Sequence, residues 1–157
     1  MNLTDIKSIQ SVGFTGFKTI EQLRREKDII PKTNGVYLIL NPHTDCSFLK
    51  IGTGGFFKGR NPNVEVELLK EKWVENSPIV YIGKATSLYK RLGQYFRFGE
   101  GKNVGHWGGR FIWQMANSSD LIVCWKETEE NPREVEKLLI QEYINHYGKR
   151  PFANLVN

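Results

Sequence analysis

The chain has 157 residues, 39% of them hydrophobic, which is enough for one globular domain with a substantial core. No apolar run reaches the length of a membrane span and the first residues lack a signal-peptide pattern, which argues against a membrane or secreted protein. The formal net charge of +5 favours an anionic partner, of which nucleic acid is one kind.

The first part of the chain predicts short helices followed by a strand. Residues 1–30 have helical character in pieces, and Thr19 is placed to cap a helix over residues 20–26. Proline and an Asn-Gly pair indicate a turn at residues 31–35. Residues 36–40 then have the apolar composition of a buried strand.

The middle of the chain predicts a long loop, a helix and a second strand. Residues 41–62 are rich in Gly, Pro, Asn and Thr and should be mostly loop, whereas residues 64–74 have the spacing of a short surface helix. Residues 79–82 form the second predicted strand. Because side chains alternate along a strand, Tyr81 should face away from its two neighbours. Gly83 can then release the chain into a turn.

A helix is predicted over residues 88–98, with Ser87 as its cap and an apolar stripe of Leu88, Leu92 and Phe96. Arg91 and Tyr95 are four residues apart and share one flank. A site that holds a phosphate and moves a proton needs a guanidinium, an ammonium and a phenol. This segment supplies them as Tyr81, Lys84, Arg91 and Tyr95. A basic amphipathic helix with a solvated arginine remains the alternative.

The last part of the chain predicts a loop, a third strand and a long helix. Residues 99–110 contain five glycines and should be loop, and residues 110–115 are a candidate helix. Residues 121–126 form the third predicted strand. The closing helix spans residues 132–147, with Asn131 as its cap and proline at its first position.

The cysteines and histidines do not form a recognisable metal or disulfide pattern. Cys46 and Cys124 are too few for a disulfide framework and predict reduced thiols, as in a cytoplasmic protein. His43, His106 and His146 show no metal-ligand spacing. We therefore expect a cytoplasmic protein without zinc.

A carboxylate lies within the apolar stripe of the closing helix. At about 100° per residue, Glu136 falls on the face defined by Val135, Leu139, Ile140, Tyr143, Ile144 and Tyr147. Glutamate is rarely buried without a partner. Three explanations remain open: an ion pair with a buried arginine, a raised pKa that keeps the group neutral, or a bound cation. Mg²⁺ prefers carboxylate oxygen and retains water, so one glutamate suffices as its protein ligand.

Two tripeptides, Gly35-Val36-Tyr37 and Tyr81-Ile82-Gly83, resemble the paired signatures of the GIY-YIG endonuclease family. Arg91, Glu136 and Asn154 stand where the family's helix arginine, metal-binding glutamate and closing asparagine are expected. Lys84 and Tyr95 look like their counterparts in the nuclease module of the bacterial excision-repair incision protein. The resemblance covers roughly residues 31–155.

The resemblance implies an α+β fold with a small three-stranded antiparallel sheet flanked by helices. We expect residues 1–157 to form a single domain of this type. Residues 1–30 would be a helical N-terminal extension, and residues 41–78 and 99–118 would be loop or helix insertions. Long surface loops of this kind are tolerated at modest entropic cost.

The resemblance also implies hydrolysis of DNA phosphodiester bonds with a single metal. Glu136 would hold Mg²⁺ or Mn²⁺, while Arg91 and Lys84 would bind the phosphate. Tyr81 or Tyr37 would accept a proton from water, a role that requires positive charge nearby to favour the phenolate. The choice between them stays open. Tyr95 and Asn154 would give support through hydrogen bonds to phosphate or backbone.

The predicted partner is DNA, double-stranded or branched, with a partner protein or a homodimer as further possibilities. The candidate nucleic-acid contacts lie in the two insertions: Lys58, Arg60, Lys102, His106 and Arg110. The leading hypothesis is a restriction-like or structure-selective endonuclease. The alternative is a catalytically silent or partner-dependent nucleic-acid-binding module of the same fold.

Overall fold

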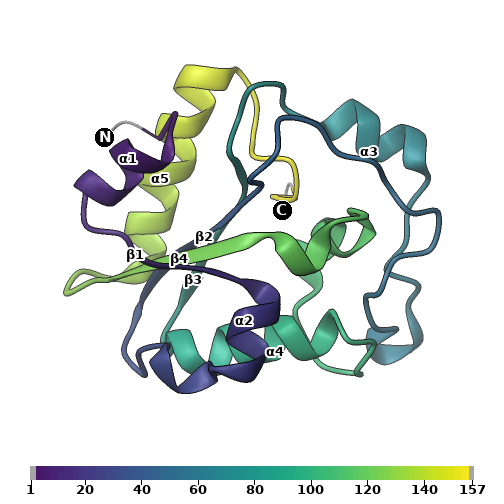
Figure 1. Cartoon of the computed structure of the whole chain (residues 1–157), viewed down its shortest axis with the longest axis horizontal. Helices are drawn as coiled ribbons and strands as arrows, with labels where there is room; N and C mark the ends of the chain where they lie inside the picture. The colour runs from purple at the N-terminus through teal and green to yellow at the C-terminus, as the bar shows by residue number, and fades with distance from the viewer. Residues whose placement is uncertain (1–2, 156–157) are drawn as a thin grey trace.

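The computed structural model describes residues 3–155 and arranges them around a four-stranded antiparallel sheet (Figure 1). The strands lie in the order β1-β4-β2-β3. Their bounds are Thr15–Thr19 for β1, Gly35–Leu40 for β2, Ile79–Ala85 for β3 and Ile122–Glu127 for β4. The α+β class and the antiparallel sheet are confirmed, but the expected count of three strands is wrong.

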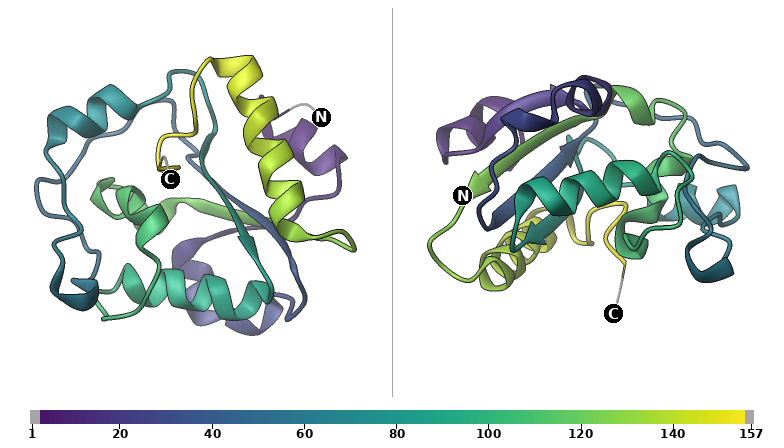
Figure 2. Two further views of the ribbon diagram at one scale, coloured as in Figure 1. Left: turned by 180° about the vertical axis from the view of Figure 1, so that it is seen from behind. Right: turned by 90° about the horizontal axis from the view of Figure 1, so that it is seen from below.

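Helices cover both faces of the sheet, as Figure 2 shows from behind and from below. The α-helices are α1 (Ile6–Ser11), α2 (Ile20–Arg25), α3 (Val66–Lys72), α4 (Leu88–Phe98) and α5 (Pro132–Tyr147). One core cluster joins the sheet to α2 and α4, and a second joins it to α1 and α5. No helix within residues 3–155 is long and apolar enough to cross a membrane.

Three helices begin where their capping residues predict. Thr19 caps α2 in a capping box with Gln22, and the Ser87 side chain accepts the Lys90 backbone N–H at the start of α4. Asn131 accepts the Arg133 backbone N–H at the start of α5. These caps satisfy backbone N–H groups that have no partner within the helix.

The strand that the sequence did not predict, β1, lies at one edge of the sheet within the segment expected to be helical. Its ladder with β4 is interrupted between Gly16 and Lys18. Gly16 has a φ of 99° and Phe17 a φ of 54°, values outside the range of a regular strand. This bulge breaks the alternation by which a strand is recognised in a sequence. The ring of Trp125 occupies the space where a side chain at Gly16 would lie.

β3 continues past the point where the sequence predicted its end. Gly83 does not start a turn, because it pairs with Tyr37 inside the β2–β3 ladder. A side chain at Gly83 would overlap the Tyr37 ring. The expected alternation also fails at Val80, which is skipped in the register with β2 and packs in the same cluster as Tyr81.

The two expected insertions pack against each other. The Gln114 side chain is buried and bonds backbone atoms of the first predicted insertion. It donates to Leu49 O at 3.1 Å and to Val64 O at 2.9 Å, and it accepts a hydrogen bond from Val64 N at 2.9 Å. The expected surface helix over residues 64–74 is present as α3. The candidate helix over residues 110–115 is instead part of a series of 3₁₀ turns, Trp107–Gln114.

Candidate active site

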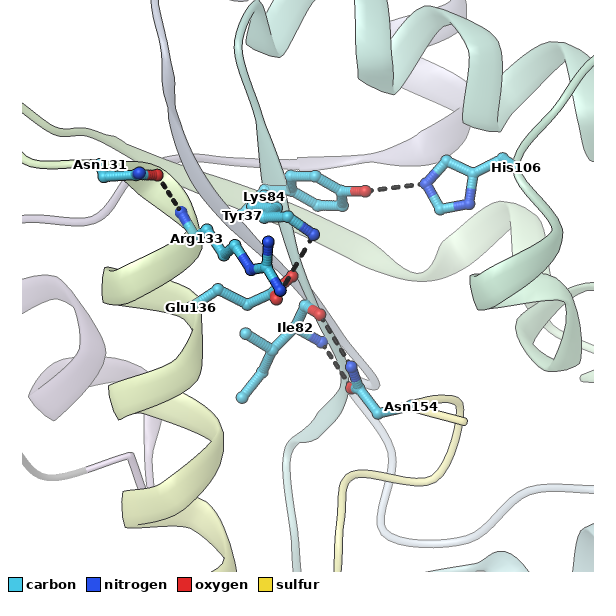
Figure 3. A network of polar contacts seen from close by, with 8 residues as sticks. All are labelled: Tyr37, Ile82, Lys84, His106, Asn131, Arg133, Glu136 and Asn154. Atoms are coloured by element: carbon cyan, nitrogen blue, oxygen red, sulfur yellow. Dashed lines mark hydrogen bonds and ion pairs between the residues drawn. The ribbon is translucent and has the colours of Figure 1, made fainter. Parts of the chain in front are cut away.

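One pocket of about 420 Å³ is lined by residues from four elements of the fold. Tyr37 comes from β2, Tyr81 and Lys84 from β3, Arg91 from α4 and Glu136 from α5. Figure 3 shows Tyr37, Lys84 and Glu136 close together where these elements meet. The structure therefore brings together five residues that the sequence analysis selected.

The pocket wraps around β3, which is an edge strand. Tyr37 and Tyr81 pack in the core cluster on the α4 side of the sheet. Ile82 packs in the cluster on the α5 side, and Lys84 shares that side because side chains alternate. Lys84 Nζ therefore lies 3.7 Å from Glu136 Oε1. The phenols reach the pocket from one side of the strand and the ion pair from the other.

The Glu136 side chain is only 18% exposed. Burial raises the pKa of its carboxyl, and the positive charges of Lys84 and Arg133 act in the opposite direction. Of the three explanations for this residue, the structure shows the ion pair, with lysine in place of arginine. The pair is not dry, because the Lys84 side chain is 46% exposed.

The two tyrosines of the pocket are held as neutral phenols. Burial raises the pKa of Tyr81 to about 12 and that of Tyr37 well above its ordinary value. Arg91 lowers both pKa values, but less than burial raises them. The sequence analysis expected nearby cations to favour the phenolate. In this pocket the loss of solvation outweighs them.

His106 was predicted to contact nucleic acid. It packs instead against the rings of Tyr37, Tyr81 and Tyr95. Its side chain is fully buried, and its ring stacks on Tyr95 with centroids 3.6 Å apart. Its Nε2 atom shares a hydrogen bond of 2.8 Å with the Tyr37 hydroxyl (Figure 3). Burial, with the Arg91 charge, lowers the pKa of the imidazole well below its usual value. A neutral, buried ring in this place supports Tyr37 and cannot reach a ligand at the surface.

The glycine-rich loop around His106 also holds two other predicted site residues. Arg91 Nη1 donates to the backbone oxygen of Gly105 at 2.8 Å. The Tyr95 hydroxyl donates to the backbone oxygen of Gly109 at 2.6 Å. Tyr95 is buried and does not line the pocket. This loop, which was predicted to be an insertion, is thus part of the scaffold of the pocket.

Asn154 lies beside the edge strand and bonds its backbone. Its side chain accepts from Ile82 N and donates to Ile82 O, both at 2.9 Å (Figure 3). The neighbouring Ala153 N–H donates to Val80 O at 2.8 Å. These bonds satisfy an otherwise unpaired edge of β3. The contact is to backbone, one of the two roles that the resemblance implied.

Arg133, which was not predicted from the sequence, lines the same pocket. It lies three residues before Glu136 on α5, so both side chains occupy one flank of the helix. Figure 3 shows its side chain beside that of Glu136. The i, i+3 spacing from the anomalous glutamate is the signal that would have identified it.

The other four candidate nucleic-acid contacts lie outside the pocket. Lys58, Arg60 and Lys102 are exposed, and Arg110 is half-buried. The guanidinium groups of Arg60 and Arg110 both lie over the ring of Trp107. The structure therefore brings two of these four side chains together.

The donor set of the pocket fits a hard divalent cation bound through a single carboxylate. Among residues 3–155, no three His, Cys, Asp or Glu side chains are grouped as a metal cage. Mg²⁺ commonly binds through one or two carboxylates together with waters and substrate phosphates. Glu136 is the residue that would hold it, since burial of this carboxylate favours a compensating positive charge.

Comparison with protein families gives one match: the model of the GIY-YIG catalytic domain matches residues 69–148. This segment contains Tyr81, Lys84, Arg91 and Glu136, whereas Tyr37 and Asn154 lie outside it. Neither the curated proteins nor the solved structures give a match.

Proposed function

The chain belongs to the GIY-YIG family, and we propose that it is a metal-dependent endonuclease that hydrolyses DNA phosphodiester bonds. Members of this family are generally endonucleases that act on DNA and typically depend on a divalent metal. We propose double-stranded or branched DNA as the substrate, cut in a restriction-like or structure-selective manner.

The observation that carries this proposal is the composition of the pocket. It combines three cationic side chains, one carboxylate and two phenols. These are Lys84, Arg91, Arg133, Glu136, Tyr37 and Tyr81. The excess of positive charge favours a phosphate group, and the carboxylate and phenols supply a metal ligand and proton-transfer groups.

The cations of the pocket bind the phosphate in the proposed reaction. Arg91 already uses Nη1 to hold Gly105, which fixes the guanidinium at the wall of the pocket. From there it stabilises the negative charge that builds on the phosphate oxygens. Lys84 lies at the rim, where its exposed ammonium meets the scissile phosphate. Glu136 would hold Mg²⁺ or Mn²⁺, and such an ion would supply Lewis-acid stabilisation of negative charge.

We assign the proton acceptor to Tyr81 and a supporting role to Tyr37. Burial raises the pKa of Tyr81 to about 12 and that of Tyr37 well above its ordinary value, so Tyr81 has the lower pKa of the two. Tyr81 is also the more exposed, at 8% against 1%. Tyr37 is held by His106, so its hydroxyl is fixed in orientation. A cation held by Glu136 would offset the carboxylate charge that raises the pKa of Tyr81.

A plasmid cleavage assay tests the proposal. The native protein with Mg²⁺ should convert supercoiled plasmid, or a plasmid carrying a four-way junction, to nicked or linear product. Glu136→Gln should lower the rate by about 100-fold or more, because charge stabilisation worth several kcal/mol is lost. Glu134→Gln is the matched control, since Glu134 is an exposed residue on the same helix.

Two outcomes would reject the nuclease assignment. One is equal cleavage by the native protein and Glu136→Gln. The other is metal-independent, salt-sensitive DNA binding with no cleavage of either substrate, which would establish the nucleic-acid-binding module instead.

A further inference from the structure

The two insertions meet in a surface that lies outside the catalytic pocket. The Lys58 backbone N–H donates to Asn103 Oδ1 at 3.1 Å, and the Gly55 N–H donates to Phe98 O at 2.9 Å. Residues 57–60 and 102–110, which are separate in the chain, are therefore held side by side.

At this junction two arginines share one aromatic ring. The guanidinium carbon of Arg60 lies 4.3 Å from the centre of the Trp107 ring, and that of Arg110 lies 4.5 Å from it. Arg110 Nη1 also donates to Trp107 O at 3.1 Å, while its buried Nε has no hydrogen-bond partner among residues 3–155. Stacking on a ring fixes a guanidinium plane and reduces the entropy that it loses on binding a ligand.

The two segments that form this surface, residues 57–60 and 102–110, carry no acidic residue. The sequence between Asp45 and Glu65 carries Lys50, Lys58 and Arg60 and no acidic residue. The sequence between Glu100 and Asp120 carries Lys102 and Arg110 and again no acidic residue. Within residues 3–155, no ion pair reaches Arg60 or Arg110, and Glu100 is paired with Arg24 at 3.7 Å.

Two cations held together without an anion repel each other. Burial and the charge of Arg60 both lower the pKa of Arg110. An anion placed against both guanidinium groups would remove this repulsion and could accept forked hydrogen bonds from each. Phosphate is negatively charged, and its oxygens match the geometry of the guanidinium donors.

We propose that Arg60 and Arg110, held on Trp107, bind the phosphate backbone of nucleic acid at a subsite separate from the catalytic pocket. This inference rests on the proposed function for the identity of the ligand. Trp107 directly follows His106, which contacts Tyr37. One loop therefore carries Trp107 and Arg110 of the subsite and also contacts Tyr37 of the pocket through His106.

Salt-dependent binding of DNA tests the subsite. Binding of a fluorescein-labelled duplex is measured by anisotropy without metal, in the Glu136→Gln background, over a series of salt concentrations. Arg60→Gln and Arg110→Gln should each weaken binding and reduce the slope of log affinity against log salt by about 1, regardless of sequence. Lys7→Gln is the control, because it removes an exposed cation from α1 on another part of the surface.

The outcomes of this experiment distinguish a failure of the subsite from a failure of the nuclease function. Unchanged slopes for both arginine variants would overturn the subsite, even if the native protein cleaves DNA. Reduced slopes with no cleavage by the native protein would support the subsite and reject only the nuclease function.

Trp107 fluorescence, isolated by comparison with Trp107→Phe, is titrated with sodium phosphate at constant ionic strength. A response to free phosphate together with unchanged DNA slopes would indicate a small-anion site and overturn the proposal.

Discussion

Three tyrosines form one cluster next to the pocket, and their surroundings give them different roles. Tyr37 and Tyr81 have ring centres 6.1 Å apart, and the Tyr95 ring centre lies 5.5 Å from that of Tyr81. Only Tyr37 and Tyr81 line the pocket. The Tyr95 hydroxyl is committed to Gly109 O. The same type of side chain therefore lines the candidate pocket at positions 37 and 81 and anchors the glycine-rich loop at position 95.

Removal of single hydroxyl groups separates these roles. Tyr81→Phe should lower plasmid cleavage by about 100-fold or more, because a proton acceptor contributes that much. Tyr95→Phe should leave cleavage within a few-fold of the native rate and lower the free energy of unfolding by about 1 kcal/mol or more, since the buried Gly109 carbonyl loses its donor. Cleavage rates and urea unfolding measure both effects. Loss of cleavage in a stable Tyr95→Phe protein would contradict this division.

At the level of the elements, β2 and β3 form the wall of the pocket because a glycine faces a tyrosine. Gly83 pairs with Tyr37 in the ladder, and the tyrosine ring lies over the glycine. This arrangement lets the phenol cross the edge strand toward the pocket. The second signature tripeptide therefore needs its glycine for the position of the first tripeptide's tyrosine and not for a turn.

Alanine at two glycines tests this reading. Gly83→Ala should lower the free energy of unfolding by about 1–3 kcal/mol, because the methyl group overlaps the Tyr37 ring, and should also lower cleavage. Gly93→Ala in α4 is the control, since its methyl group would meet only the end of the Arg97 side chain, at 3.3 Å. The control should be neutral or stabilising by up to about 1 kcal/mol. Equal urea midpoints for Gly83→Ala and the native protein would refute the packing argument.

At the level of the whole molecule, a buried imidazole joins the second insertion to the sheet. The Tyr37–His106 bond spans 69 positions of the chain. The pKa of His106 is lowered in the folded protein, so below about pH 6.5 the unfolded chain binds a proton that the folded chain does not. This difference makes the folded state less stable as the pH falls.

The pH dependence of unfolding measures that contribution. As the pH is lowered from 6.5, the native protein should lose up to about 1.4 kcal/mol of unfolding free energy per pH unit through this group. His106→Gln keeps a polar partner for Tyr37 but does not titrate, so its stability should fall less steeply. Urea unfolding at several pH values between 5 and 7.5 gives the two slopes, an interval chosen around the ordinary histidine pKa of about 6.5. Parallel curves would show that His106 does not titrate as inferred.

Much of the fold could be predicted because the signals are local. Caps at Thr19, Ser87 and Asn131, the apolar run of β2 and the helical spacing of α5 are each read within a few residues. The family assignment, now confirmed, also rests on short motifs in order. β1 was not predicted because of a bulge at Gly16 and Phe17, both of which have positive φ angles. The bulge interrupts the alternation of side chains between the two faces of the strand.

The sequence by itself determined helices α2 to α5, three of the four strands at their approximate positions, the family and the anomaly of Glu136. These depend on residues close together in the chain. The tertiary structure alone decided that Lys84 faces that glutamate, that the His106 ring bonds the Tyr37 hydroxyl, and that Arg60 joins Arg110 on Trp107. Such contacts join distant segments, and burial, which sets the pKa values in the pocket, exists only after those segments have packed.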